Sequence, residues 1–182
     1  MFCHSWHAWA LWLLGYPTQA VQHMHAALAL VRDLAHTFSR AAALHYAARI
    51  HQFRREAQLT QETVEASVTL ATEQGFAFWS TTGTILRGWA LSAQGQGAEG
   101  IRQMRQGLTA WRATGAAISL PNWLALLAEA YGRVGQPAEG LPLLGEALAA
   151  LHSTGERVYE AELHRLKGEL LLVLPTDHTQ WL

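Results

Sequence analysis

The sequence predicts an all-α protein, a right-handed α-solenoid of about four and a half helix-turn-helix units. Three observations lead to this fold class. One series of turn residues recurs every 40 positions, at Gly15, Arg55, Gly95 and Gly135. A second series has the same period, is offset by 20 positions, and comprises Ala35, Gly75, Gly115 and Gly155. Half of the 182 residues are hydrophobic, so the two-helix unit that such a period indicates can bury a continuous core.

The turn residues place the helices in order along the chain. The first helices of successive units are expected over 3–14, 39–54, 79–94, 119–134 and 157–173. The second helices are expected over 17–35, 57–74, 97–114 and 137–154. Pro17 and Pro137 each follow a turn glycine by two residues, where proline is tolerated as the first residue of a helix. Pro121 is expected to open the first helix of the fourth unit.

Small residues recur at matched positions of the units. In the first helices they are Ala8, Ala48, Gly88, Ala128 and Gly168. In the second helices they are Ala20, Thr60, Gly100 and Gly140, then Ala27, Ser67, Gly107 and Ala147. Large apolar residues recur beside them, at Met24, Val64, Met104 and Leu144 and at Trp6, Tyr46, Leu86, Leu126 and Leu166. Small side chains let the backbones of neighbouring helices approach closely, while the large ones interdigitate.

These units predict a single repeat domain over 1–174, followed by a tail over 175–182. The units cover about 1–38, 39–78, 79–118 and 119–156, with a half unit over 157–174. The chain opens inside a first helix and ends with a first helix that lacks its partner. Solenoids normally carry polar capping units, so we expect a piece of a longer protein, with flanking repeats or domains, whose uncapped ends can self-associate.

The repeat resembles a known family. The residues Leu127-Ala128-x-x-Tyr131, followed by Gly140, Leu144 and Ala147, resemble the tetratricopeptide repeat (TPR), although each unit here is about six residues longer. The segments GWALSAQGQGAEGIRQMRQGL and GERVYEAELHRLKGELLL are similar to the C-terminal repeat regions of large bacterial signal-transduction ATPases. Those proteins carry nucleotide cyclase, kinase or DNA-binding domains, and some are transcriptional regulators. The motifs of their ATPase and cyclase domains are absent from this sequence, so the resemblance implies none of those activities.

The resemblance also implies a binding groove whose inner wall is built by the first helices. The residue after each small position, and its neighbour one turn earlier, would face this groove. The candidate groove residues are Trp9, His45, Arg49, Trp89, Glu129, Arg165 and Glu169, with Ser5, Ile85 and Ala125 beside them. Trp and Arg are favoured at the centres of protein interfaces. The alternative is that these positions are solvated or pack against the adjacent unit.

Composition restricts the partners. The net charge is −1 and the 13 basic residues are scattered, so we expect no nucleic-acid partner. No window supplies the roughly 20 apolar residues of a membrane helix, so we expect no membrane partner. Cys3 is the only cysteine, which indicates a reducing compartment and a cytoplasmic protein. Twelve of the basic residues are Arg, and this excess with abundant Ala and Gly suggests a GC-rich bacterial genome.

No catalytic arrangement can be recognised, so neither an enzyme nor a cofactor is expected. Gly95-x-Gly97-x-x-Gly100 matches the dinucleotide-binding spacing, but it follows a helix where that motif needs a strand. Five potential metal ligands lie near the start of the chain, at Cys3, His4, His7, His23 and His25. His4 and His7 can share a helix face, whereas His23 and His25 point to different sides of theirs, so no metal site is expected. The stripe of Trp6, Trp9 and Trp12 packs against a neighbouring repeat or, alternatively, lines the groove.

The sequence therefore predicts a non-catalytic scaffold that binds protein or peptide. We interpret it as the sensor or interaction segment of a bacterial signalling regulator, whose occupied groove biases an attached effector domain. Two alternatives stay open. An apolar pocket near Trp9 and Trp89 could take a small-molecule inducer, or the chain could be a truncated remnant of a larger regulator with no independent function.

Overall fold

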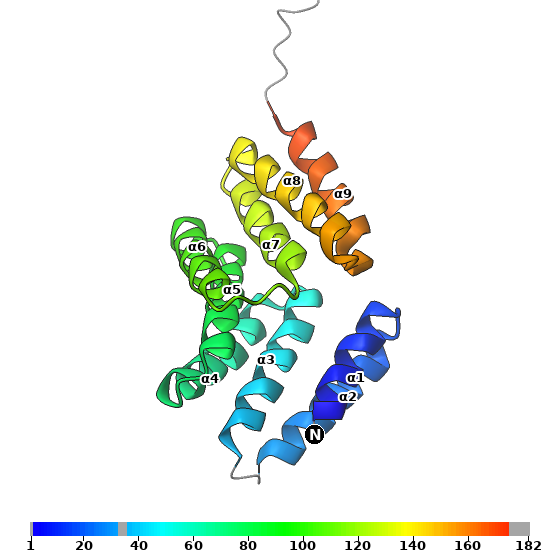
Figure 1. The fold of residues 1–182 in the computed structure, drawn as a ribbon, viewed down its shortest axis with the longest axis vertical. Helices are drawn as coiled ribbons and strands as arrows, with labels where there is room; N and C mark the ends of the chain where they lie inside the picture. Colours follow the sequence, from blue (N-terminus) through cyan, green and yellow to red (C-terminus); the bar gives the residue numbers. More distant parts are fainter. Residues whose placement is uncertain (1, 33–35, 175–182) are drawn as a thin grey trace, which may run out of the picture. The chain divides into compact units, whose positions relative to one another are not determined.

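The computed structural model describes residues 2–32 and 36–174, and these residues form helices and turns with no strand (Figure 1). The helices are α1 (Phe2–Leu13), α2 (Pro17–Arg32), α3 (Thr37–Phe53), α4 (Ala57–Glu73), α5 (Ala77–Ala93), α6 (Gly97–Ala113), α7 (Leu120–Arg133), α8 (Pro137–Thr154) and α9 (Glu160–Leu172). A short 3₁₀ helix, η1 (Arg157–Tyr159), precedes α9. The all-α prediction is confirmed for this part of the chain. None of its helices is long and apolar enough to cross a membrane.

The predicted helix order agrees with the structure to within a few residues. The largest difference lies in the final helix. It was expected to begin at residue 157, but the backbone makes a 3₁₀ turn there and α9 begins at Glu160. Pro17 and Pro137 are the first residues of α2 and α8, as predicted. The expected end of the second helix at residue 35 and the tail over 175–182 lie outside the described residues.

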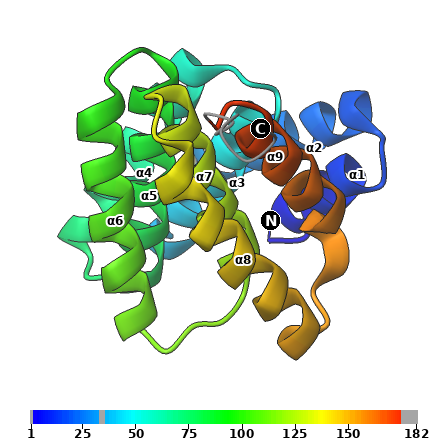
Figure 2. The same ribbon diagram turned by 90° about the horizontal axis from the view of Figure 1, so that it is seen from above.

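The chain divides into two compact units, Met1–Ala117 and Ile118–Leu182. The first unit holds three antiparallel hairpins, α1–α2, α3–α4 and α5–α6, and each hairpin packs on the next (Figure 1). Figure 2 shows α5 and α6 of the last hairpin side by side. In the second unit α7 pairs with α8, and α9 packs against both. The single repeat domain expected over 1–174 stays a prediction.

Within residues 2–32 and 36–174, the turns inside the hairpins and those between them share one backbone conformation. Glycines in the left-handed region, with φ between +70° and +87°, stand at 15, 75, 95, 115, 135 and 155. Arg55 occupies the same place with φ +62°. After five of these seven residues, the next amide N–H donates to the carbonyl five residues back, as in Gln136 N to Tyr131 O at 2.9 Å. This bond satisfies a carbonyl at the helix end, so the periodic turn residues are helix-closing residues.

The small residues lie where the helices approach each other. Ala8, Ala48 and Ala128 are buried, and a Cβ built on Gly88 would lie 2.6 Å from the backbone oxygen of Gly100. Two members of the columns do not follow the pattern. Trp6 is 40% exposed, although its ring contacts the Trp9 ring edge-on and the Tyr46 ring of α3 at a tilt. A Cβ on Gly168 would meet nothing within 4 Å, because no described helix follows α9 to pack on that face.

Candidate functional site

The four candidate groove residues of the first unit lie mostly inside it. Trp9 on α1 is half-buried, whereas His45 and Arg49 on α3 and Trp89 on α5 are buried. The structure brings Trp9 and Arg49 together, because the guanidinium carbon lies 5.2 Å from the centroid of the Trp9 ring. The same carbon lies 5.8 Å from the ring of Phe53, so Arg49 is held by aromatic faces on two sides.

His45 is a core residue. Its ring lies 5.1 Å from that of Trp79 in centroid distance, and its Nδ1 is 3.5 Å from the hydroxyl of Thr82. Burial, followed by the nearby Arg49 charge, lowers the pKa of His45 well below its ordinary value. A neutral, enclosed imidazole packs helices together. The burial of His45, Arg49 and Trp89 favours the packing alternative at these positions, and their contact with a ligand stays a prediction.

The second unit holds a cleft between α7 and α9. Its volume is about 500 Å³, and its lining residues are Glu129, Gly132, Arg133, Leu166, Glu169, Leu170, Leu172 and Val173. Two candidate groove residues, Glu129 and Glu169, therefore line the same cleft from different helices. The floor is apolar, since Leu166 and Leu170 are buried beneath the more exposed Leu172.

Charged pairs border this cleft. Arg133 Nη2 donates to Glu129 Oε1 at 2.9 Å, four residues back on α7. On α9 the third candidate residue of this unit, Arg165, donates to both Glu162 and Glu169. The hydrogen bond to Glu162, with the neighbouring carboxylate charges, raises the pKa of Arg165, so its guanidinium stays charged. An apolar floor with charged borders suits one apolar side chain flanked by polar groups.

Glycine shapes the α7 wall of the cleft. A Cβ on Gly132 would lie 2.5 Å from a methyl carbon of Leu170, so the missing side chain lets Leu170 sit directly against α7. Leu170 therefore packs closely against α7 and forms part of the cleft floor. The sequence pattern selects Glu129 and Glu169 but misses Gly132, because no residue type recurs at that position of the repeat.

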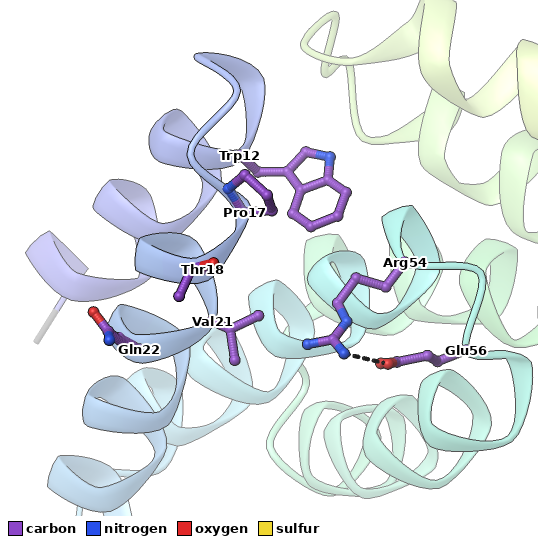
Figure 3. A pocket seen from close by; sticks show the side chains of 7 residues that line it. All are labelled: Trp12, Pro17, Thr18, Val21, Gln22, Arg54 and Glu56. Atoms are coloured by element: carbon purple, nitrogen blue, oxygen red, sulfur yellow. Dashed lines mark ion pairs between the residues drawn. The ribbon is translucent and has the colours of Figure 1, made fainter.

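A second cleft, of about 540 Å³, lies within the first unit (Figure 3). It is lined by Trp12, Pro17, Thr18, Val21, Gln22, Arg54 and Glu56. The Trp12 ring stacks on Phe53 with 11° between the ring planes. One oxygen of the Glu56 carboxylate forms an ion pair with Arg54 Nη2 at 2.7 Å, and the other oxygen lies 2.7 Å from His51 Nδ1. Of this set, the sequence indicates only Trp12 as a possible ligand contact and Pro17 as the first residue of a helix. It does not point to Arg54 and Glu56, because they flank the turn residue Arg55 and belong to no repeat column.

The histidines of the first hairpin also meet. Nδ1 of His4 lies 2.9 Å from Nδ1 of His23, and the rings of His7 and His23 are 4.1 Å apart in centroid distance. His25 is exposed, as its expected separation from His23 around the helix requires. Within the described part of the chain, no group of three or more His, Cys, Asp or Glu side chains is arranged to hold a metal ion.

Solved structures decide the fold. TPR-like repeats of a Podosopora anserina protein described as a kinesin light chain match 93% of this chain and 92% of their own, at a TM-score of 0.60 and 21% identity. Aspartyl phosphate phosphatase F from Bacillus subtilis matches 92% of this chain and 44% of its own, at a TM-score of 0.67 and 12% identity. The chain is a TPR-like repeat solenoid. In the predicted division into repeats, α7 and α9 correspond to the first helices of consecutive units.

Sequence comparison adds one relative and no family assignment. No protein-family model matches the chain. An uncharacterised protein of Rhizobium meliloti (strain 1021) is 26% identical over 163 residues, which are 90% of this chain. The chain spans 16% of that relative's length.

Proposed function

We propose that this TPR-like chain is a non-catalytic scaffold that binds a peptide segment of a partner protein in the α7/α9 cleft. The observation that carries the proposal is the position of Glu129 and Glu169, which come from two consecutive first helices and line one apolar cleft. First helices are where the TPR resemblance predicts the binding wall. The structural neighbours support the scaffold through their fold.

The cleft suggests the chemistry of the peptide. Leu166 and Leu170 offer room for one leucine-sized or aromatic anchor, and burial of such a side chain is worth roughly 1.5–3 kcal/mol. The exposed Glu169 and the half-exposed Arg133 stand on opposite helices and carry opposite charges, so they can fix the direction of the peptide. We expect a short amphipathic helix or an extended segment with one apolar anchor.

A random peptide library selected on the chain tests this function. Selected peptides should bind the Leu172→Glu variant at least about tenfold more weakly, because a carboxylate enters the apolar cleft. Glu169→Lys should change which flanking charges are selected. Leu59→Glu is the matched control, since Leu59 is an exposed leucine of α4 remote in sequence from the cleft. Peptides that bind all three variants equally would show that the cleft is not the binding site.

The wider role of the chain is inferred from its longer relative and from the sequence resemblance. We infer that the chain is the sensor or interaction segment of a longer cytoplasmic bacterial signalling regulator, with flanking repeats or domains. The relative of which it covers 16% supports the longer parent, and the sequence resemblance to ATPase-linked repeat regions supports the signalling role. Peptide occupancy of the cleft would then bias the effector domain of the parent.

One observation favours a second candidate function, a small-molecule sensor. The first-unit cleft has the volume of a drug-sized site and combines the Trp12 ring and Val21 with the Arg54 guanidinium. Such walls suit a planar, largely apolar molecule with polar groups that meet the Arg54–Glu56 ion pair. Thermal-shift screening with a metabolite library tests it, and a hit should be lost in Trp12→Ala and kept in Leu172→Glu. A chain that melts without cooperativity would instead indicate a remnant with no independent function.

A further inference from the structure

Three histidines form a compact cluster between α1 and α2, apart from both clefts. His4 and His7 stand three residues apart on α1, and His23 reaches between them from α2. The Nδ1–Nδ1 distance of His4 and His23 is 2.9 Å, so one ring must carry a proton on that nitrogen and donate it to the other. The His23 ring lies 4.1 Å from the His7 ring and 5.2 Å from the His4 ring in centroid distance. Neutral rings satisfy this arrangement, because the N–H of one imidazole can donate to the unprotonated nitrogen of the other.

No carboxylate is available in the surrounding helices to balance further protons. α1 and α2 contain no Asp or Glu, and their other titratable groups are Cys3, His25 and Arg32. α3, which packs against both helices, contributes no carboxylate: its titratable groups are Tyr46 and the basic Arg40, His45, Arg49 and His51. Glu56, the first acidic residue after α3, is held by Arg54 and His51.

We propose that His4, His7 and His23 form an acid-sensitive latch, which holds α1 on α2 at neutral pH and loosens this hairpin when the cluster takes up more than one proton. Two imidazolium rings at 4–5 Å repel each other, and the helices around them add only positive charge. The rest of the hairpin contact is apolar and has no charge to lose, since Ala8, Leu11, Ala20 and Met24 pack with Ala47 and Ile50 of α3.

The direction of the effect follows from the His23 environment. Burial, then the charges of His7 and His4, lower the pKa of His23 below its ordinary value of 6.5. The unfolded or opened hairpin therefore takes up the proton first as the pH falls. The stabilisation by the neutral cluster is complete above pH 6.5 and is lost as the pH falls through the lower folded-state value.

Hydrogen exchange of the whole chain tests the latch. Protection of the α1 amides, corrected for the intrinsic pH dependence of exchange, should fall several-fold between about pH 7.5 and about pH 5, because the opened hairpin binds the proton more readily than the closed one. Helix α7 contains no histidine and serves as the internal reference. A parallel loss of protection in α1 and α7 would overturn the proposal, because it would report general acid unfolding.

Matched variants separate the cluster from other histidines. His23→Gln should abolish the extra loss in α1, whereas His25→Gln, an exposed histidine of the same helix, should keep it. An undiminished loss in His23→Gln overturns the latch. Should His23→Gln fail to fold, the ring titration of His23 by NMR decides: its midpoint should lie below 6.5 and rise in His7→Gln. A midpoint unchanged in His7→Gln overturns the proposal.

Discussion

One methyl group separates alanine from glycine, and at the α5–α6 crossing there is no space for it. A Cβ on Gly88 would lie 2.6 Å from Gly100 O, and a Cβ on Gly100 would lie 2.5 Å from Gly88 O. Both obstacles are backbone atoms, which cannot move aside as a flexible side chain can. The two helices must therefore separate to admit either methyl group.

We expect Gly88→Ala to destabilise the chain by about 1–3 kcal/mol, the usual cost of overpacking. The free energy of unfolding from denaturant titration measures it. Gly168→Ala is the control, because a Cβ there meets nothing within 4 Å and alanine has the better helix propensity. Equal stability of Gly88→Ala and the parent chain would show that the helices do not approach as closely as described.

The environment of His45 predicts a loss of stability in acid that is separate from the effect of the histidine cluster in the first hairpin. Thr82 Oγ1 donates to Phe78 O at 2.7 Å, which leaves its lone pair to accept from His45 Nδ1. Burial and Arg49 lower the pKa of His45, so the unfolded chain binds its proton more readily. The stabilisation is complete above pH 6.5 and is lost as the pH falls below it.

We therefore expect the free energy of unfolding to fall with pH below 6.5, by up to about 1.4 kcal/mol per pH unit for each such proton. His45→Gln should reduce this slope even if it lowers stability at neutral pH. His164→Gln, at an exposed position of α9, should leave the slope unchanged. A slope that is the same in His45→Gln and the parent chain would mean that folding does not lower the pKa of His45.

At the scale of the helical element, the turn residues can be tested apart from packing. Gly135 has φ +72° and Gly145 lies within α8, yet a Cβ on either would meet nothing within 4 Å. The two sites differ in backbone conformation, but both have space for a methyl group. Gly135→Ala should therefore cost about 1–2 kcal/mol through left-handed strain, whereas Gly145→Ala should gain roughly 0.5–1 kcal/mol of helix stability. Thermal melting of both variants checks this, and a stabilised Gly135→Ala would show that the turn is not left-handed.

Periodicity predicted the elements well because each turn is a local event. A left-handed residue closes a helix wherever the chain places it, so Gly95 and Gly135 could be recognised from sequence alone. Even Arg55 was found by its position in the period, and it adopts φ +62° against the preference of its type. The 3₁₀ start at Arg157 was not foreseen, because it depends on local hydrogen bonding that no repeat column encodes.

The candidate site was less predictable, because exposure depends on tertiary packing. One sequence rule selected Trp89 and Glu169 as equivalent positions, yet Trp89 is buried and Glu169 is exposed. Fold resemblance gives the helix that a residue occupies, while the neighbouring side chains decide whether a ligand can reach it. The His4–His23 contact joins residues 19 positions apart and needed the hairpin geometry to be seen.

At the scale of the whole molecule, the exposed apolar side chains at the end of α9 bear on how the chain behaves in solution. Leu171, Leu172 and Val173 are 50%, 86% and 62% exposed at the end of α9, and the last two line the α7/α9 cleft. A contiguous apolar surface beside a cleft favours association. Self-association and peptide binding would then compete for one surface.

We expect the average mass from light scattering to rise with the concentration of the parent chain and to stay monomeric in Leu172→Glu, because a carboxylate at this position must be desolvated on association. Leu30→Glu, at a 48% exposed leucine of α2, should associate as the parent does. A selected peptide that binds the cleft should lower the mass of the parent chain in proportion to its occupancy. Association that persists in Leu172→Glu would place the contact elsewhere and remove the competition, while leaving the peptide cleft itself to be judged by its own binding variants.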